Sequence, residues 1–211
     1  MVNEAVHDGS SVLDAGAGTS NRFRYDLKDR VQNIVGVGAD IRVESNPLLH
    51  RGIRCDISDI PVDDNSFDVV FSRYVLEHIS EPTQFLREMH RVLKPGGRFI
   101  FLTPNKWHYV TLAARMTPHW FHEWYNSRLR ASHNDDTFPT KYRLNTTKSL
   151  NRQFAAAGFD RDILIQRESC PNYLLWSYPT FFLGLMYERV VNSTDLPGGI
   201  RVNLLGTYKN T

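Results

Sequence analysis

The sequence contains only two cysteines, Cys55 and Cys170, and they show neither a pairing framework nor the spacing of metal ligands. Such sparse cysteine usage is typical of a reducing compartment, so we expect a cytoplasmic location. The longest uncharged stretch, residues 169–187, is interrupted by prolines, whereas a membrane-spanning helix needs about 20 predominantly apolar residues. The first residues also lack a basic run followed by an apolar core. The sequence therefore predicts neither a transmembrane span nor a signal peptide.

The net charge is small as well, because 25 lysines and arginines are nearly balanced by 23 acidic residues, which gives a formal net charge of +2. So small a net charge gives no electrostatic argument for nucleic-acid binding. Aromatic residues make up 12% of the chain, and with the low net charge this composition excludes a disordered protein. A length of 211 residues fits one domain whose sheet carries helices on both faces. We therefore expect residues 1–211 to form a single α/β domain.

Short apolar runs alternate with helical patterns along the chain, as they do in folds built on a parallel sheet. Strands are predicted at residues 11–15, 33–37, 52–55, 67–71, 98–102, 162–166 and 201–208. Helical patterns cover residues 19–30, 80–94 and 147–157. The first of these is weakly apolar and predicts a short or irregular helix, and the connection from Asp40 to Gly52 is too short for a full helix with two loops.

The clearest helix lies between the fourth and fifth predicted strands. Ser80 is expected to cap it, and its apolar face runs from Phe85 to Leu93. The turn at residues 95–97, Pro-Gly-Gly, is expected to end the helix and to start the fifth strand.

Residues 105–145 depart from this alternation and are rich in aromatic residues and histidines. Helical stretches are predicted near residues 107–116 and 119–130. Because the segment follows the fifth strand, we interpret it as an insertion over the carboxyl edge of the sheet. His119, His122 and Glu123 have the helical spacing of a shared metal site, but a polar helix face is the favoured interpretation, and no metal is expected.

A glycine-rich turn, Asp14-Ala15-Gly16-Ala17-Gly18, follows the first predicted strand. Gly16 and Gly18 let the backbone approach a ligand closely, at the edge where open α/β sheets bind ligands. Asp40 follows the second strand and suits a pair of ribose hydroxyls, while Asp56 follows the third and suits an adenine amino group. Each acid taken alone is also compatible with a solvated turn or a helix cap. Together, the three acids predict one rim of consecutive strand ends that binds an adenosine-containing ligand.

Two phosphate-binding alternatives fit the turn less well. A dinucleotide fingerprint needs glycine or alanine at its sixth position, where this chain has Asn21, and Asp14 brings like charge toward a pyrophosphate. A phosphate-cradling P-loop needs a Gly-Lys-Ser/Thr ending, which is absent. A ligand with an adenosine, an ammonium group and no phosphates fits better, and S-adenosylmethionine has this chemistry. A nucleotide-dependent oxidoreductase remains the less favoured alternative.

Several motifs, in order over residues 11–159, resemble those of the class I S-adenosylmethionine-dependent methyltransferases. They are VLDAGAG at 12–18, VGADI at 37–41, CDI at 55–57, IPVDDNSFD at 60–68, SRYVLEH at 72–78 and RVLKPGGR at 91–98. The pattern is particularly similar to the branch that includes ubiquinone and menaquinone biosynthesis enzymes. The resemblance implies a Rossmann-like seven-stranded, mostly parallel sheet with a reversed final strand. It also implies methyl transfer from S-adenosylmethionine to a small molecule, with a non-catalytic S-adenosylmethionine-binding relative as the alternative.

The resemblance further implies cofactor-binding residues at the ends of four strands. They are Asp14, Gly16 and Gly18 around the methionine moiety, Asp40 at the ribose, Asp56 and Ile57 at the adenine, and Ser72 and Arg73 beneath the sulfonium, with Ala15 and Ile41 beside them. The chain departs from the family pattern at Ser20, where a third glycine is usual. Only about ten residues precede the first strand, so the N-terminal helices that cover the cofactor in relatives are expected to be missing or truncated, or replaced by residues 105–145.

The acceptor side is predicted from the aromatic insertion and one histidine. Four residues are expected to bind an apolar or aromatic acceptor: Trp107, His108, Trp120 and Tyr125. His78, just after the fourth strand, suits a general base, or a structural histidine that bonds a backbone group. No Asn/Asp-Pro-Pro-Tyr/Phe motif follows that strand, which argues against DNA base methylation and favours a small-molecule acceptor.

Residues 173–187 form a second apolar segment. Packing against the sheet is the favoured interpretation of this segment. Peripheral contact with a membrane surface or with a partner is the alternative.

Overall fold

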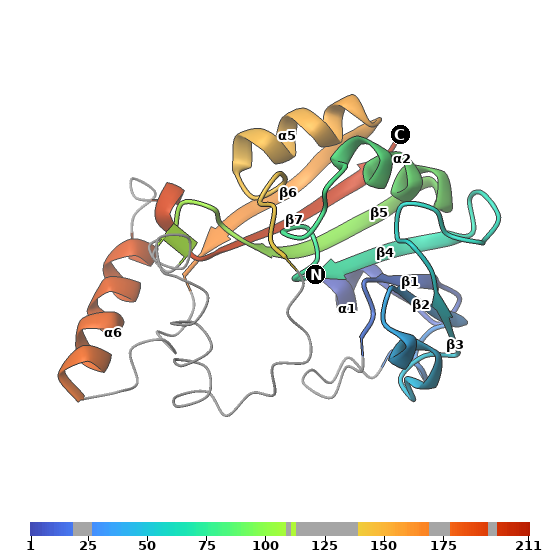
Figure 1. The fold of residues 1–211 in the computed structure, drawn as a ribbon, viewed down its shortest axis with the longest axis horizontal. Coiled ribbons are helices and arrows are strands. Elements are labelled where there is room, and N and C mark those ends of the chain that lie inside the picture. Colours follow the sequence, from blue (N-terminus) through green and yellow to red (C-terminus); the bar gives the residue numbers. More distant parts are fainter. Residues whose placement is uncertain (19–26, 109–110, 113–138, 169–177, 194–197) are drawn as a thin grey trace.

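The structure is a computed structural model of the chain, and it describes residues 1–18, 27–108, 111–112, 139–168, 178–193 and 198–211 (Figure 1). Within these residues, seven strands form one sheet in the order β3-β2-β1-β4-β5-β7-β6. Their bounds are β1 Ser11–Ala15, β2 Asn33–Gly38, β3 Arg51–Arg54, β4 Phe67–Arg73, β5 Leu93–Pro104, β6 Phe159–Arg167 and β7 Asn203–Asn210. β7 runs antiparallel to β5 and β6, and the other neighbours are parallel. The predicted mostly parallel sheet with a reversed final strand is confirmed.

Both faces of the sheet are covered, because successive side chains of a strand point to opposite faces. On one face, Leu13 of β1 and Val70 of β4 belong to the larger apolar core, beneath α2 (Pro82–Val92) and α5 (Thr147–Ala156) (Figure 1). One residue earlier in each strand, Val12 and Val69 belong to a second core on the opposite face, which includes residues of α1 (Val2–Ala5). Strands buried on both faces explain the continuous apolar runs of the sequence.

Both ends of α2 differ from the predictions. The N–H of Leu93 still donates to the carbonyl of Met89, yet Leu93 already pairs with Phe67 of β4. Residues 95–97 therefore lie within β5, where Gly96 has a φ of +80°, and they do not end the helix. The prediction that Ser80 caps the helix is also wrong, because the helix follows Glu81 without a side-chain cap. Proline in the first turn starts the helix instead, since its fixed φ suits that position and its missing N–H is not needed there.

The other predicted connections agree with the structure where it describes them. The short link between β2 and β3 is the 3-10 helix η1 (Ile41–Ser45). Thr146 caps α5, since its hydroxyl accepts from the N–H of Ser149 at 3.1 Å. The helices expected near residues 19–30, 107–116 and 119–130 lie largely or wholly outside the described residues, and so do His119, His122 and Glu123.

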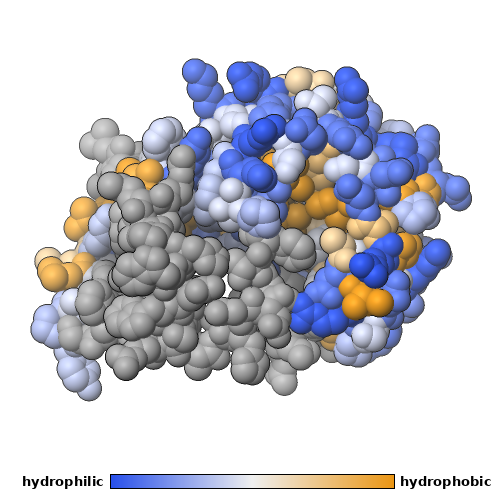
Figure 2. Space-filling model, viewed as in Figure 1, coloured by the Kyte–Doolittle hydropathy of each residue, from blue (hydrophilic) through white to orange (hydrophobic). Residues whose placement is uncertain are grey.

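The helix α6 (Tyr178–Ser193) and the short η4 (Gly198–Ile200) lie at one end of the molecule, beyond the strands (Figure 1). The apolar side chains Tyr178, Phe182, Leu183 and Met186 are 61–84% exposed, and hydrophobic residues reach the surface at this end (Figure 2). The favoured packing of residues 178–187 against the sheet is therefore wrong, because the helix lies past the end of the sheet. Residues 173–177 are outside the described part of the chain. No described helix is long and apolar enough to cross a membrane.

Candidate functional site

The turn after β1 is closed by a backbone contact that requires glycine. Gly16 has a φ of +96°, and a Cβ at this position would lie 2.2 Å from Cγ2 of Val75. The N–H groups of Gly16 and Ala17 both donate to the carbonyl of Val37 in β2, at 2.8 and 2.9 Å. A Cβ on Gly18 would instead meet no atom of the described residues within 4 Å. The turn thus lies against the end of β2 and leaves space beside Gly18.

Four parallel strands bring most of the predicted cofactor residues to one edge of the sheet. β1, β2, β3 and β4 point the same way, so residues 14–18, Asp40, Asp56 and residues 72–73 all lie near their carboxyl ends. The hydroxyl of Ser72 donates to the carbonyl of Ala15 at 2.9 Å and ties β4 to the glycine turn. Burial raises the pKa of Asp14 to about 7, while the Arg73 guanidinium acts in the opposite direction. Burial therefore favours the uncharged form of Asp14 more than in an exposed aspartate.

Asp40 lies just after β2, as predicted, and its carboxylate is held by Arg42. Oδ1 accepts from the backbone N–H of Arg42 at 2.9 Å and caps η1, while Oδ2 accepts from Nε at 2.7 Å and from a second guanidinium nitrogen. These hydrogen bonds from Arg42 hold the pKa of Asp40 below its usual value. The neighbouring Ile41 is 60% exposed. Asp40 is therefore an ionised acceptor whose partner in this structure is a partly exposed guanidinium.

Asp56 and Ile57 follow β3 at the sheet edge. The N–H of Cys55 donates to the carbonyl of Gly38 at 3.1 Å, which holds this end of β3 against β2. Asp56 is exposed and accepts from the N–H of Ser58 at 2.8 Å, whereas Ile57 packs against the larger core. Asp56 thus closes a turn of the chain while its carboxylate stays at the surface.

The loop after β4 begins with a strained aromatic residue that the sequence analysis did not single out. Tyr74 has a φ of +56°, and its N–H donates to the carbonyl of Leu102 at 2.8 Å. Its side chain is 42% exposed, and the guanidinium of Arg73 lies 5.8 Å from the ring centroid. A bulky side chain in the left-handed region is rare, and such strain is concentrated at functional sites.

A buried acid follows in the same loop, and it too was missed as a candidate. Glu77 is 5% exposed and accepts at Oε2 from the hydroxyl of Thr103 at 3.1 Å. That hydroxyl in turn accepts from the side-chain amide of Asn145 at 2.6 Å. Burial raises the pKa of Glu77 to about 7. The available signal was the position of Glu77 between apolar Leu76 and the buried Ile79, which indicates an inward-facing carboxyl group.

This buried acid predicts a pH-dependent stability. The ordinary pKa of 4.5 applies in the unfolded chain, so between pH 4.5 and about 7 the unfolded state has lost a proton that the folded state keeps. Stability is highest below the lower value and falls as the pH rises through about 7. In the wild type we expect the free energy of unfolding to fall by roughly 1–3 kcal/mol over this range, as measured by urea titration at several pH values. Glu77→Gln is expected to abolish this fall. Glu81→Gln, at an exposed position, is the control, and an unchanged slope in Glu77→Gln would contradict the assignment.

His78 is next to Glu77 and is held by the chain segment that leads into α5. Its Nδ1 lies 3.2 Å from the carbonyl oxygen of Pro139, and the N–H groups of Lys141 and Tyr142 donate to the carbonyl of Glu77 at 2.6 and 3.0 Å. Because a carbonyl only accepts, this contact puts the proton on Nδ1 and the lone pair on Nε2. The backbone contact is the one expected of a structural histidine, and the tautomer is the one that a general base needs.

The residues predicted to bind the acceptor are only partly brought together. Trp107 is 53% exposed, whereas His108 is 1% exposed and lies with Nε2 3.3 Å from Oε2 of the buried Glu168. His108 thus lies between the segment after β5 and the end of β6. The side chain of Asn105 donates to the carbonyl of Arg201, which holds the segment after β5 close to the start of β7. Burial of His108 favours a structural role over contact with an acceptor. Trp120 and Tyr125 lie outside the described residues.

The sheet order with its reversed β7, and the glycine turn after β1, define an α/β domain of the methyltransferase type. Residues 13–101 match the family described as a methyltransferase domain. Over these residues the chain is similar to the class I S-adenosylmethionine-dependent methyltransferases. S-adenosylmethionine is the methyl donor in this family.

Curated relatives include ubiquinone/menaquinone biosynthesis C-methyltransferases. The protein of Hahella chejuensis is 36% identical over 118 residues, which are 48% of this chain and 45% of that protein. The protein of Cellvibrio japonicus is 33% identical over 137 residues, covering 54% of this chain and 53% of that protein. The chain thus spans about half the length of the curated relatives it matches.

Solved structures share the fold at low sequence identity. The geranyl diphosphate C-methyltransferase from Streptomyces coelicolor A3(2) has a TM-score of 0.64 and 13% identity, with 100% of this chain and 76% of that chain covered. An S-adenosylmethionine-dependent methyltransferase from Mesorhizobium loti has a TM-score of 0.58 and 16% identity, with 96% and 91% covered. At these identities the likeness is one of fold alone.

Proposed function

We propose that the protein transfers a methyl group from S-adenosylmethionine to a small-molecule acceptor. The observation that carries this proposal is the turn at Gly16, which packs against the end of β2 and has acids on neighbouring strand ends. A turn with a close backbone approach and no phosphate-binding lysine suits an adenosine ligand without phosphates.

The residues present fit this cofactor. We assign Asp14, Ala15, Gly16 and Gly18 to the methionine part, Asp40 and Ile41 to the ribose, Asp56 and Ile57 to the adenine, and Ser72 and Arg73 to the region beneath the sulfonium. The space beside Gly18 supports this assignment, since a side chain there would meet no described atom within 4 Å. Asp40 is an ionised acceptor, and two ribose hydroxyls would take the place of the guanidinium of Arg42 as its partners.

When bound by these residues, S-adenosylmethionine would supply an electrophilic methyl group to a nucleophilic atom of the acceptor, with a neutral thioether as the leaving group. The protein's part is to orient the two reactants and to exclude water. Where the acceptor must lose a proton, the Nε2 lone pair of His78 is the group that we assign to take it.

An apolar or aromatic acceptor is supported by the aromatic content of residues 105–145, which we propose as the acceptor-side insertion of a single domain over residues 1–211. Trp107 is the exposed member of this set that the structure describes. A reducing, cytoplasmic location also stays a proposal, and it is supported by the absence of a cysteine framework in the sequence.

Calorimetric titration with S-adenosylmethionine, S-adenosylhomocysteine and NAD tests the proposal. We expect S-adenosylmethionine and S-adenosylhomocysteine both to bind and NAD to bind much more weakly, because Asn21 and Asp14 disfavour a pyrophosphate. Incubation with S-adenosylmethionine and a metabolite extract is then expected to yield a small molecule that gains the mass of one CH2 group. Cofactor binding without any methylated product would favour a non-catalytic S-adenosylmethionine-binding relative. NAD as the tighter ligand would favour the oxidoreductase.

A further inference from the structure

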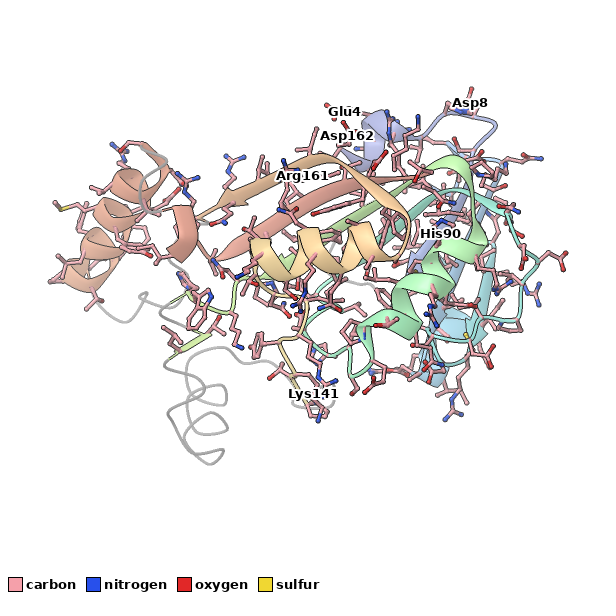
Figure 3. The ribbon with its side chains drawn as sticks, turned by 90° about the horizontal axis from the view of Figure 1, so that it is seen from above. Glu4, Asp8, His90, Lys141, Arg161 and Asp162 are labelled. Carbon is pink, nitrogen blue, oxygen red and sulfur yellow. The ribbon has the colours of Figure 1, made fainter. Side chains whose placement is uncertain are left out.

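A recess lies between α2 and α5, the two helices over the larger core. It has a volume of about 740 Å³ and is bounded by the first turns of α2, by one side of α5 along its length and by the segment that joins Lys141 to Thr146. Figure 3, which looks onto α2 and α5, shows Lys141 on this segment next to the two helices. None of the residues that we assign to S-adenosylmethionine lines the recess.

The recess is strongly cationic. Five basic side chains and one carboxylate are among its described lining: Arg87, Lys106, Lys141, Arg143, Arg152 and Glu81. Glu81 accepts from Arg143 at 3.3 Å, and both side chains are more than half exposed. Lys106 lies over the ring of Trp107 at 5.7 Å. Within the described residues, Arg87, Lys141 and Arg152 have no acidic partner, so basic side chains outnumber acidic ones in the part of the recess that the structure describes.

A neighbouring recess on the other side of α2 shows that this excess is local. It has a volume of about 370 Å³, and its lining contains Glu81 and Glu88 as well as Arg87 and Arg91. Arg91 is neutralised there by Glu88 at 2.7 Å and by Asp64 at 2.6 Å. Two recesses of the same surface thus differ in charge, and only the one between α2 and α5 keeps its cations without matching acids in the described structure.

The wall of the cationic recess is held in place by hydrogen bonds. The hydroxyl of Ser149 and the amide of Gln153 both donate to the carbonyl of Arg143, which ties the segment before α5 to the helix. Gln153 also donates to the Ser149 hydroxyl at 2.9 Å. Neither α2 nor α5 carries an acidic residue in its first turn, where acids ordinarily interact with the positive end of a helix. Among the described lining residues, the carboxylate at this point is therefore that of Glu81, which directly precedes α2.

We propose that this recess binds a small molecule carrying at least two negative charges, such as a diphosphate or a phosphorylated metabolite. Guanidinium groups bind phosphate oxygens through paired, charge-assisted hydrogen bonds, and Arg87 and Arg152 offer this geometry from α2 and α5. The volume falls within the range of about 300–1,000 Å³ found for small-ligand sites. A compact recess between two helices suits a small ligand better than an extended polymer. The recess contains none of the residues assigned to S-adenosylmethionine, and it borders the acceptor side, because Lys106, Lys141 and Arg143 belong to residues 105–145.

Inorganic pyrophosphate is the probe for this site. In titrations of the full chain at low salt, we expect a dissociation constant below about 1 mM, unchanged when the protein is saturated with S-adenosylhomocysteine. Arg152→Glu is expected to weaken binding at least tenfold, because it removes one cation and adds an opposing charge. Lys148→Glu, an equal charge reversal on α5 outside the recess lining, is expected to change it less than twofold. Thermal melting of each variant shows that the protein is folded.

Four results would overturn the proposal. The first is no pyrophosphate binding at 10 times the expected constant, and the second is equal weakening by Lys148→Glu, which would indicate general surface charge. The third is a single-stranded oligonucleotide that binds more tightly than pyrophosphate and is equally sensitive to Arg152→Glu, which would indicate a nucleic-acid surface. If Arg152→Glu melts early, Lys141→Glu provides the same test from the other wall. Competition by S-adenosylhomocysteine would assign pyrophosphate to the glycine turn and so contradict a second site.

Discussion

The variant His78→Ala is expected to lower the rate of methyl transfer by roughly 10²–10⁴-fold when the acceptor must lose a proton. The contact between Nδ1 and the carbonyl of Pro139, at 3.2 Å, puts the lone pair on Nε2, and loss of the ring removes this base. The affinity for S-adenosylhomocysteine is expected to stay within a few-fold of the wild type, since His78 lies in the loop after β4 and not in the glycine turn. The measurement is the pH–rate profile of both proteins with the acceptor found in the extract.

His78→Gln separates a chemical role from a structural one. The glutamine amide can still donate to the Pro139 carbonyl, but it has no basic nitrogen. We expect it to be as slow as His78→Ala, and the inflection of the wild-type profile to be absent from both variants. A His78→Gln enzyme with wild-type turnover and an unchanged profile would show that the histidine only holds the segment before α5. The base would then be unnecessary, as expected for an acceptor that is already ionised or electron-rich.

Asp40→Ala is expected to weaken cofactor binding tenfold or more. The carboxylate is ionised and accepts three hydrogen bonds from Arg42 in this structure. We propose that two ribose hydroxyls replace the guanidinium, and each charge-assisted bond contributes about 1.5–3 kcal/mol to binding. Calorimetric titration with S-adenosylhomocysteine measures the loss. The melting temperature of the unliganded protein is expected to change little, because exposed ion pairs contribute about 0–1 kcal/mol to stability.

Two matched variants test whether Asp40 binds the ligand or only shapes its own turn. Asp40→Asn retains an oxygen that caps η1 but loses the charge, so it is expected to weaken binding nearly as much as Asp40→Ala. Arg42→Ala removes the competing guanidinium and is expected to leave the affinity unchanged or to raise it a few-fold. Equal weakening by Arg42→Ala and Asp40→Ala would mean that the pair acts by ordering residues 40–45, and the ribose carboxylate would have to lie elsewhere.

Most of the sheet could be predicted from local patterns. The apolar run at β1, the glycine turn and the acid after β2 are close in sequence, and each depends on backbone preferences that a few residues determine. The end of α2 could not be predicted in this way. Leu93 pairs with Phe67 and thereby starts β5 before the Pro-Gly-Gly turn, so a contact across 26 residues decides a boundary that local turn signals place later.

In the candidate site, too, the positions of the residues could be predicted but their surroundings could not. The order of Asp14, Gly16, Asp40 and Ser72 along the chain was enough to place them at one edge, because parallel strands bring their carboxyl ends together. The environment of each side chain was not predictable. Three examples depend on the geometry of the folded chain: Arg42 donates hydrogen bonds to Asp40, Tyr74 has a strained backbone, and His108 is buried against Glu168.

The class of fold, the position of the glycine turn and the similarity to methyltransferases could be predicted from short motifs and their order along the chain. Which acids are desolvated and which stay exposed depends instead on the folded chain. Glu77 has a raised pKa since Thr103 and the segment at Asn145 enclose it, and desolvation is set by atoms far away in the sequence. The same holds for the cationic recess, which exists because α2 and α5, about 60 residues apart, pack side by side on one face of the sheet.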